Sequence, residues 1–261
     1  VRCLLRVSIY HVSYMRGLFP EKCFKGVVSQ DCLCLHIKML MPKDDESKRL
    51  VEWVEEGVHD ALRKRYLKQM LFGLSSDADG TKLIEVISQV LVCSLQKANV
   101  SSVKYQVCRL IRMLVQVCQT LDKVPNERYV FMKLVYNDDA PDDYEPPYFR
   151  SLEPESVGYF ARKPFSMHVG DVATNHHAVT LKVKSVLDCC GAYGEPADEK
   201  SIQFSTTVGH AEDEESQSVQ EGGDAAVTLD SGAQECLSQP AMKIGPDNQP
   251  SYPQLASKAG A

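Results

Sequence analysis

The residues best suited to chemistry are cysteine and histidine side chains that alternate along one short segment. Cys32, Cys34 and His36 are two positions apart, so on a β-strand they project from the same face. Thiolates and imidazoles are zinc ligands, but a structural zinc site needs a fourth ligand, and no C-x-x-C or H-x-x-x-H pair supplies it. We therefore interpret this triplet as one face of a half-buried strand, and His176-His177 as a turn between strands.

Carboxylates also gather in one proline-containing segment: Asp138, Asp139, Asp142 and Asp143. Their spacing is not that of a calcium-binding loop, so we interpret them as solvated loop charges. The sequence contains no P-loop, dinucleotide-binding glycine pattern, nucleophile elbow or zinc-protease motif. None of the ten cysteines is singled out as a nucleophile by a nearby histidine. We predict no enzymatic activity, no cofactor and no metal.

Composition divides the chain into two parts. The formal charge of the whole chain is −6, but positions 189–261 carry three lysines against twelve acidic residues, or −9, which leaves +3 for 1–188. The acidic part is rich in Gly, Ser and Pro and has too few apolar residues to offset the entropy lost on ordering. We predict a folded domain over 1–188 and an acidic disordered tail over 189–261. No apolar run approaches the roughly 18–20 residues of a membrane span, so we expect no membrane partner.

The sequence predicts three helices. Apolar residues at helical spacing predict helices over 1–15, from Pro42 to about Leu71, and over 102–122. An aspartate, Asp44 or Asp45, caps the second of them. Gly57 lies within that helix, where it costs about 1 kcal/mol relative to alanine, so we interpret it as a point of close packing against a neighbour.

Alternating apolar residues predict strands over 33–40, 128–136 and 179–187, whereas 83–95 is ambiguous between helix and strand. In the last strand we expect Val179, Leu181, Val183 and Leu187 on the core face. Lys182 and Lys184 then point outward. Long helices packed on a mainly antiparallel sheet make an α+β fold.

Five runs of residues occur in the order typical of one family. They are YMRGLFPE at 14–21, LMP at 40–42, TLDKVP at 120–125, DYEPPYF at 143–149 and LKVKSV at 181–186. On these motifs the chain resembles the HORMA domain of meiotic chromosome-axis proteins, close to the plant asynaptic type. The resemblance covers about 1–188. The family carries a longer N-terminal segment, and residues 84–101 diverge from its pattern. We therefore interpret the chain as a fragment or variant gene model, and expect a central strand to be missing.

The resemblance implies a HORMA-like α+β fold whose function is to bind peptides. In the family, the C-terminal part of the domain, here about 144–187, is a mobile safety belt. The belt wraps over a closure-motif peptide that adds to the sheet as a strand, so main-chain hydrogen bonds provide affinity and alternate side chains provide specificity. The site residues that the resemblance implies are Tyr144, Pro146, Pro147, Tyr148, Phe149, Val179, Leu181 and Val183.

The resemblance also implies partners and a location. The partners are closure-motif peptides of axis-core proteins or of the family's own tails, which would give self-association, and an AAA+ ATPase that reopens the belt. Chromatin is a further partner, reached directly or through other proteins. The implied location is the nucleus, on meiotic chromosomes, in support of synapsis and homologous recombination. Direct DNA binding is the alternative, and the domain charge of +3 beside an acidic tail disfavours strong attraction to phosphates.

Overall fold

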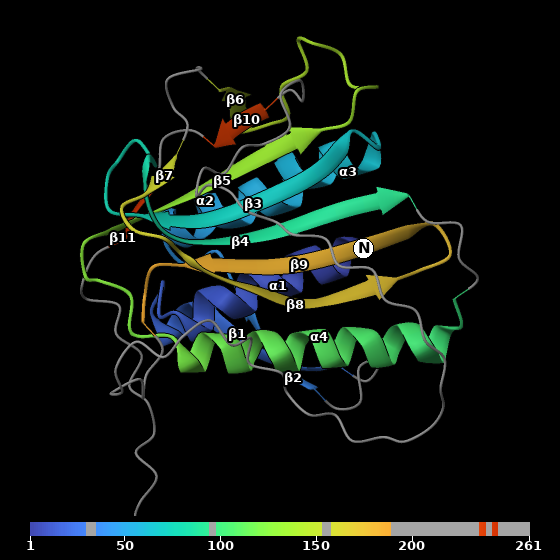
Figure 1. The fold of residues 1–261 in the computed structure, drawn as a ribbon, viewed down its shortest axis with the longest axis horizontal. Coiled ribbons are helices and arrows are strands. Elements are labelled where there is room, and N and C mark those ends of the chain that lie inside the picture. The colour runs from blue at the N-terminus through green and yellow to red at the C-terminus, as the bar shows by residue number, and fades with distance from the viewer. Residues whose placement is uncertain (30–34, 94–97, 153–157, 189–234, 239–241, 245–261) are drawn as a thin grey trace, which may run out of the picture.

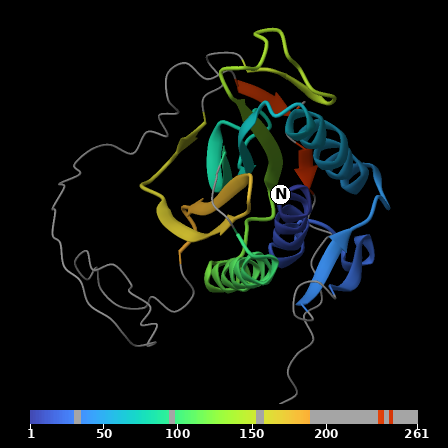
Figure 2. The same ribbon diagram turned by 90° about the vertical axis from the view of Figure 1, so that its right-hand side faces the viewer.

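The computed structural model describes residues 1–29, 35–93, 98–152, 158–188, 235–238 and 242–244. A nine-stranded sheet is its centre, with the helices on one face (Figures 1 and 2). Along the sheet the strand order is β6-β10-β5-β3-β4-β9-β8, while β11 pairs with β5 and β7 pairs with β4. All pairings are antiparallel except that of β7 with β4, so the predicted α+β class is confirmed.

The N-terminal elements agree with the sequence. Helix α1 (Arg2–Met15) buries the predicted stripe of Leu5, Ile9 and Val12. The helix ends just before Gly17, which takes a left-handed backbone conformation (φ 60°) that suits glycine. The short helix η1 (Glu21–Cys23) leads into β1 (Phe24–Ser29), which pairs with β2 (Leu35–Leu40) as a separate two-stranded sheet.

The second predicted helix is shorter than expected. It comprises α2 (Asp45–Glu52), the π-helix η2 (Trp53–Val58) and α3 (His59–Arg63), and Asp44 caps it by accepting a 2.8 Å hydrogen bond from the Ser47 amide. The predicted end at Leu71 is wrong, because the chain turns at Arg65 (φ 65°) and enters strand β3 (Leu67–Ser75). This strand is buried on both faces, and such a strand has no alternating pattern to distinguish it from a helix.

The ambiguous segment becomes strand β4 (Lys82–Cys93), which pairs with β3 on one side and β9 on the other. The expected loss of a central strand is therefore wrong, because this divergent segment is itself central. Helix α4 (Val100–Thr120) and strand β5 (Arg128–Tyr136) agree with the sequence. Strands β8 (Phe165–Ala173) and β9 (His177–Ser185) form a hairpin on β4.

A buried ion pair joins the helices to the sheet. Arg16 Nη2 lies 3.0 Å from Glu85 Oε2, and both side chains are almost fully buried. The same guanidinium donates to the carbonyls of Cys118 (3.1 Å) and Asp122 (2.9 Å) at the end of α4. Ser185 at the end of β9 donates to Glu85 from 3.4 Å. Burial raises the pKa of Glu85, and the nearby Arg16 charge opposes that rise. One buried carboxylate thus connects α1, α4, β4 and β9.

Replacing Glu85 by glutamine leaves the Arg16 guanidinium buried without its counter-charge. We expect Glu85→Gln to lower the free energy of unfolding by about 3–5 kcal/mol, measured by urea denaturation. The control is Glu21→Gln, which breaks the more exposed pair between Glu21 and Lys38 and should cost less than about 1 kcal/mol. Equal losses in the two variants would show that the buried pair contributes no more than a surface pair.

Candidate strand-binding site

A strand from far along the sequence lies between β5 and β6 (Figure 1). Strand β10 (Glu235–Ser238) runs antiparallel to both neighbours, with Cys236 opposite Leu134 of β5 on one edge and opposite Ser151 of β6 (Phe149–Ser151) on the other. The edge of β5 would otherwise present unpaired backbone N–H and C=O groups. The sheet therefore holds an added strand along both of the strand's edges.

Strand β11 (Met242–Ile244) continues along the same edge of β5. Met242 lies opposite Val130 and Ile244 opposite Arg128. Both apolar side chains join the main core, at 3% and 0% exposure, while Lys243 between them is exposed. The sequence predicted no regular structure in this tail, and these two strands differ from that prediction. The tail's average composition obscures a short apolar stretch, which pairs with the edge of β5. Residues 189–234 lie outside the described residues.

The segment that follows β5 crosses the face of the sheet opposite the helices. Side chains on that face form a second, smaller core, because residues of β3, β4 and β5 alternate between the two faces. Its buried members are Leu71, Leu83, Val86 and Phe131, and Leu152 and Phe160 of the crossing segment pack against them. Strand β7 (Tyr159–Phe160) then pairs with the start of β4. The chain thus contacts one edge of β10 through β5 and the other through β6, and β7 pairs with β4 farther along the sheet.

The start of this crossing segment is fixed to α3 through a tyrosine. Tyr144 is buried, and its hydroxyl donates to Asp60 Oδ2 at 2.8 Å. The rings of Tyr66 and Tyr136 meet it edge-on, with centroids 5.0 and 5.1 Å away, and Lys64 Nζ lies 4.6 Å from the centre of its ring. Tyr144 therefore acts as a packed and hydrogen-bonded anchor.

A second anchor explains the glycine within the long helix. A Cβ atom at Gly57 would lie 2.4 Å from the Phe149 ring and 2.6 Å from the Pro147 carbonyl oxygen. The prediction of close packing at Gly57 is confirmed, and the neighbour is the start of β6. The adjoining Tyr148 has a left-handed backbone (φ 67°) and is 39% exposed, whereas Pro146 is buried.

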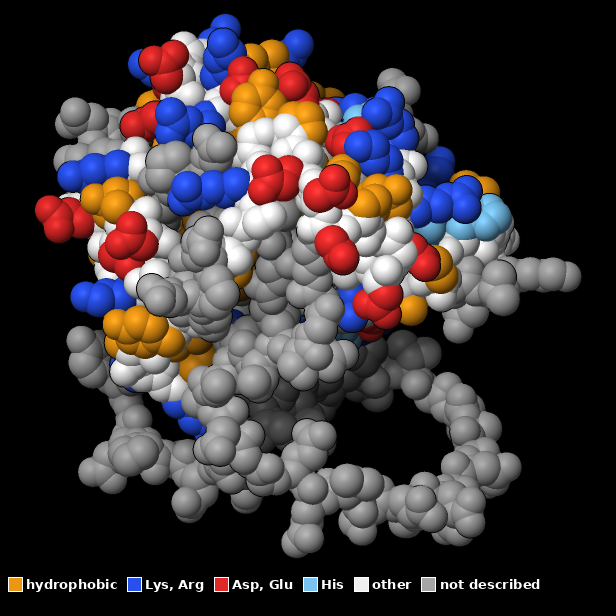
Figure 3. Space-filling view, turned by 90° about the horizontal axis from the view of Figure 1, so that it is seen from above, with side chains coloured by type: hydrophobic (Ala, Val, Ile, Leu, Met, Phe, Trp, Pro, Cys, Tyr) orange, Lys and Arg blue, Asp and Glu red, His pale blue; other side chains and the backbone are white. Residues whose placement is uncertain are grey.

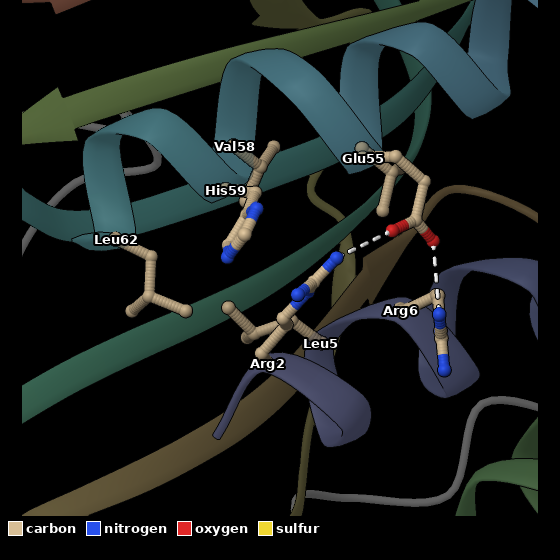
Figure 4. Close-up of a pocket in the computed structure, with 8 residues that line it drawn as sticks. Arg2, Leu5, Arg6, Glu55, Val58, His59 and Leu62 are labelled. Atoms are coloured by element: carbon tan, nitrogen blue, oxygen red, sulfur yellow. Dashed lines mark hydrogen bonds and ion pairs between the residues drawn. The ribbon is translucent and has the colours of Figure 1, made fainter.

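The helix that carries Gly57 is in turn tied to α1. Figure 4 shows a hollow between them, where side chains of α1 point toward Glu55 of the π-helix. Arg2 and Arg6 each lie 3.2 Å from one of its carboxylate oxygens. These ion pairs fix the position of η2, against which β6 packs.

The structure places the expected site residues in two separate groups. Tyr144, Pro146, Pro147, Tyr148 and Phe149 lie at the β6 edge, beside the added strand. Val179, Leu181 and Val183 lie in β9, which three strands separate from β10. Their side chains are 1%, 1% and 2% exposed and face the core as predicted. Lys182 and Lys184 share strand β9 with them, so these two lysines do not lie beside β10.

The sequence analysis missed the tail residues that fill the site. The available signal was the alternation of Met242, Lys243 and Ile244, a short strand pattern inside an acidic, glycine-rich tail. It also missed the Tyr144 partners Asp60 and Lys64, because nothing in the sequence indicates that residues some 80 positions apart meet.

Within the described residues, no cluster of three or more His, Cys, Asp or Glu side chains is arranged to hold a metal. Cys32 and Cys34 lie outside the described residues, and His36 is exposed. No helix in the described part of the chain is both long and apolar enough to span a membrane. On the face seen from above, basic and acidic side chains lie next to one another, with apolar groups between them (Figure 3).

Gly57→Ala tests the packing of β6 on the helix. The added methyl group collides with Phe149, so β6 must shift and its pairing with β10 weaken. We expect faster amide hydrogen exchange in β6 and β10 and a lower melting temperature. The control is Gly26→Ala in β1, where a Cβ atom meets nothing within 4 Å. Unchanged exchange in both variants would mean that β6 does not depend on this contact.

The Tyr144 anchor predicts a pH-dependent stability. Burial raises the pKa of Asp60, but hydrogen bonds from Lys64, Tyr144 and Arg63 outweigh it and leave that pKa below its ordinary value. A lowered carboxyl pKa stabilises the fold above the unfolded-state value of about 3.9 and ceases to do so as pH falls through the folded-state pKa.

We therefore expect Tyr144→Phe to cost about 1 kcal/mol at pH 7, by urea denaturation, and less as the pH falls below about 4. Tyr105→Phe, at a residue that is 60% exposed, serves as the control and should cost almost nothing. A pH-independent cost at Tyr144 would argue against the bond to Asp60.

The family model of the HORMA domain matches residues 1–88 and 86–177. Meiosis-specific protein ASY1 of Arabidopsis thaliana is 40% identical over 215 residues, which cover 72% of this chain and 36% of ASY1. Meiosis-specific protein ASY2 of the same plant is 33% identical over 238 residues, which cover 71% of this chain and 17% of ASY2. The chain thus spans well under half the length of these two relatives.

The fold agrees with these matches. The structure of C. elegans HTP-2 bound to HTP-3 closure motif 1 resembles this one with a TM-score of 0.63, over 70% of this chain and 83% of that one. The two sequences are only 18% identical, so this similarity concerns the fold alone. The matched motifs, the family model and the shared fold lead to one conclusion: the chain belongs to the HORMA-domain family.

Proposed function

We propose that this chain is a non-enzymatic adaptor of the meiotic chromosome axis, which captures closure-motif peptides as an added strand. The observation that carries the proposal is β10, which pairs with β5 on one edge and β6 on the other. A peptide bound in this way gains affinity from main-chain hydrogen bonds, with no reacting group required. The strand that fills the site is the chain's own.

Residues 144–187 act as the safety belt in this proposal. Tyr144 and Phe149 anchor its start, the segment to β7 crosses the sheet, and the β8–β9 hairpin closes it on β4. Three β9 side chains are buried by at least 98%, and each such burial is worth about 1.5–3 kcal/mol. Spontaneous opening is therefore slow, which is the physical reason for including an AAA+ ATPase among the partners.

The remaining partners follow from the family. Closure motifs of axis-core proteins or of related chains would recruit this one to meiotic chromosomes in the nucleus, where it supports synapsis and recombination. Self-association follows when the tail of one copy fills the site of another. Chromatin is reached through these partners, because a charge of only +3 over 1–188 offers little attraction for phosphates.

A charge on the core face of β9 tests the belt. Val183→Asp buries an unpaired carboxylate, so the hairpin should leave β4 and the belt should no longer hold β10. We expect amide exchange in 235–244 to become fast, while circular dichroism shows that the chain keeps most of its helical content.

The matched control is Lys182→Asp, an equally polar change at the exposed neighbouring position, which should leave exchange in 235–244 slow. If Val183→Asp retains a protected tail strand, β9 does not belong to a belt that locks a peptide.

A further inference from the structure

We propose that the site selects its strand through two apolar side chains separated by one residue, supplied here by Met242 and Ile244. This inference rests on the proposed function, because it states which peptides the site accepts. The partner class is an extended segment that carries an apolar-x-apolar pair beyond the part held between β5 and β6.

The two halves of the tail contact the sheet in different ways. Strand β10 is held on both edges by backbone pairing, which provides affinity. In β11, by contrast, Met242 and Ile244 are inserted into the main core, with 3% and 0% exposure. Lys243 between them is exposed and free to vary. The β11 half therefore places a side-chain requirement on the peptide.

The surroundings of the two side chains exclude charge, and positive charge above all. Met242 lies opposite Val130, which is fully buried. Ile244 lies opposite Arg128, whose buried guanidinium donates to the carbonyls of Gly17 (2.8 Å) and Pro125 (2.9 Å). A lysine at the position of Ile244 would be buried next to this cation, with no carboxylate across the strand pair.

Spacing adds a second criterion. Leu237 lies opposite Lys133, and Met242 lies opposite Val130. Between these positions the tail has four residues, 238–241, and β5 has two, 131 and 132, so the peptide carries two extra residues. An accepted peptide thus places the first residue of its apolar pair five positions after the residue that lies opposite Lys133.

The first test uses the full chain and its own tail. In Ile244→Lys, amides of 235–244 and the β5 amides that face them should exchange on the order of a hundredfold faster. Lys243→Ala should leave these amides as slow as in the unmodified chain. Slow exchange in α4 serves as the folding control. Equal protection in Ile244→Lys and Lys243→Ala would overturn the inference.

The second test separates this inference from the proposed function. The Ile244→Lys chain, whose own tail competes about a hundredfold less well for the site, is titrated with fluorescently labelled synthetic peptides spanning 232–247, and anisotropy reports binding. The native and Lys243→Ala peptides should bind alike, and the Ile244→Lys peptide on the order of a hundredfold more weakly. Equal binding of all three overturns the apolar-pair rule and leaves peptide capture intact. Failure of the native peptide to bind, with the exchange result as expected, would overturn capture in trans and leave the rule valid for the chain's own tail.

Discussion

The rest of the structure depends on the edge of β5 that β10 and β11 cover. This strand is central to the core, with Val130, Met132 and Leu134 fully buried, so its backbone groups lie at the border of a dry interior. Each amide or carbonyl left unpaired in such a place costs about 1–3 kcal/mol. The tail strands satisfy them, and β6 closes over the outer edge of β10. The contacts of Tyr144 and Phe149, the segment that follows β6 and the β8–β9 hairpin all help to keep β6 beside β10.

The contacts that hold β6 are linked, through neighbouring helices, to the rest of the sheet. Gly57 allows the Phe149 ring to pack on the π-helix. Glu55 of the same helix forms ion pairs with Arg2 and Arg6 of α1. At the other end of α1, Arg16 forms an ion pair with Glu85 of β4. The β9 hairpin ends at the same carboxylate, through Ser185. A shift of β6 or of the β8–β9 hairpin would therefore disturb contacts made with or next to α1, and single π-helical turns occur frequently at functional sites.

Much of this arrangement could be predicted from the sequence, and the exceptions have physical causes. Amphipathic elements such as α4 and β9 were evident because one face of each is polar. β3 and β4 are covered on both faces, so their apolar runs lacked the period that distinguishes strand from helix. Gly57 indicated close packing, but the sequence could not name Phe149 as the neighbour. The tail strands were hidden because composition averages over 73 residues, whereas β11 needs only three, and its partner strand lies more than 100 residues away.

The double pairing of β10 has a mechanical consequence. A strand held between two antiparallel neighbours and pulled along its own axis is loaded in shear, so every hydrogen bond on both edges shares the force. When β6 is lifted away instead, the bonds of one edge break in turn. The attachment is therefore strong along the direction of the captured chain and weak against peeling of the strand that covers it. Tension transmitted through a bound partner would be resisted, while a machine that lifts the covering strand needs to break only a few bonds at a time.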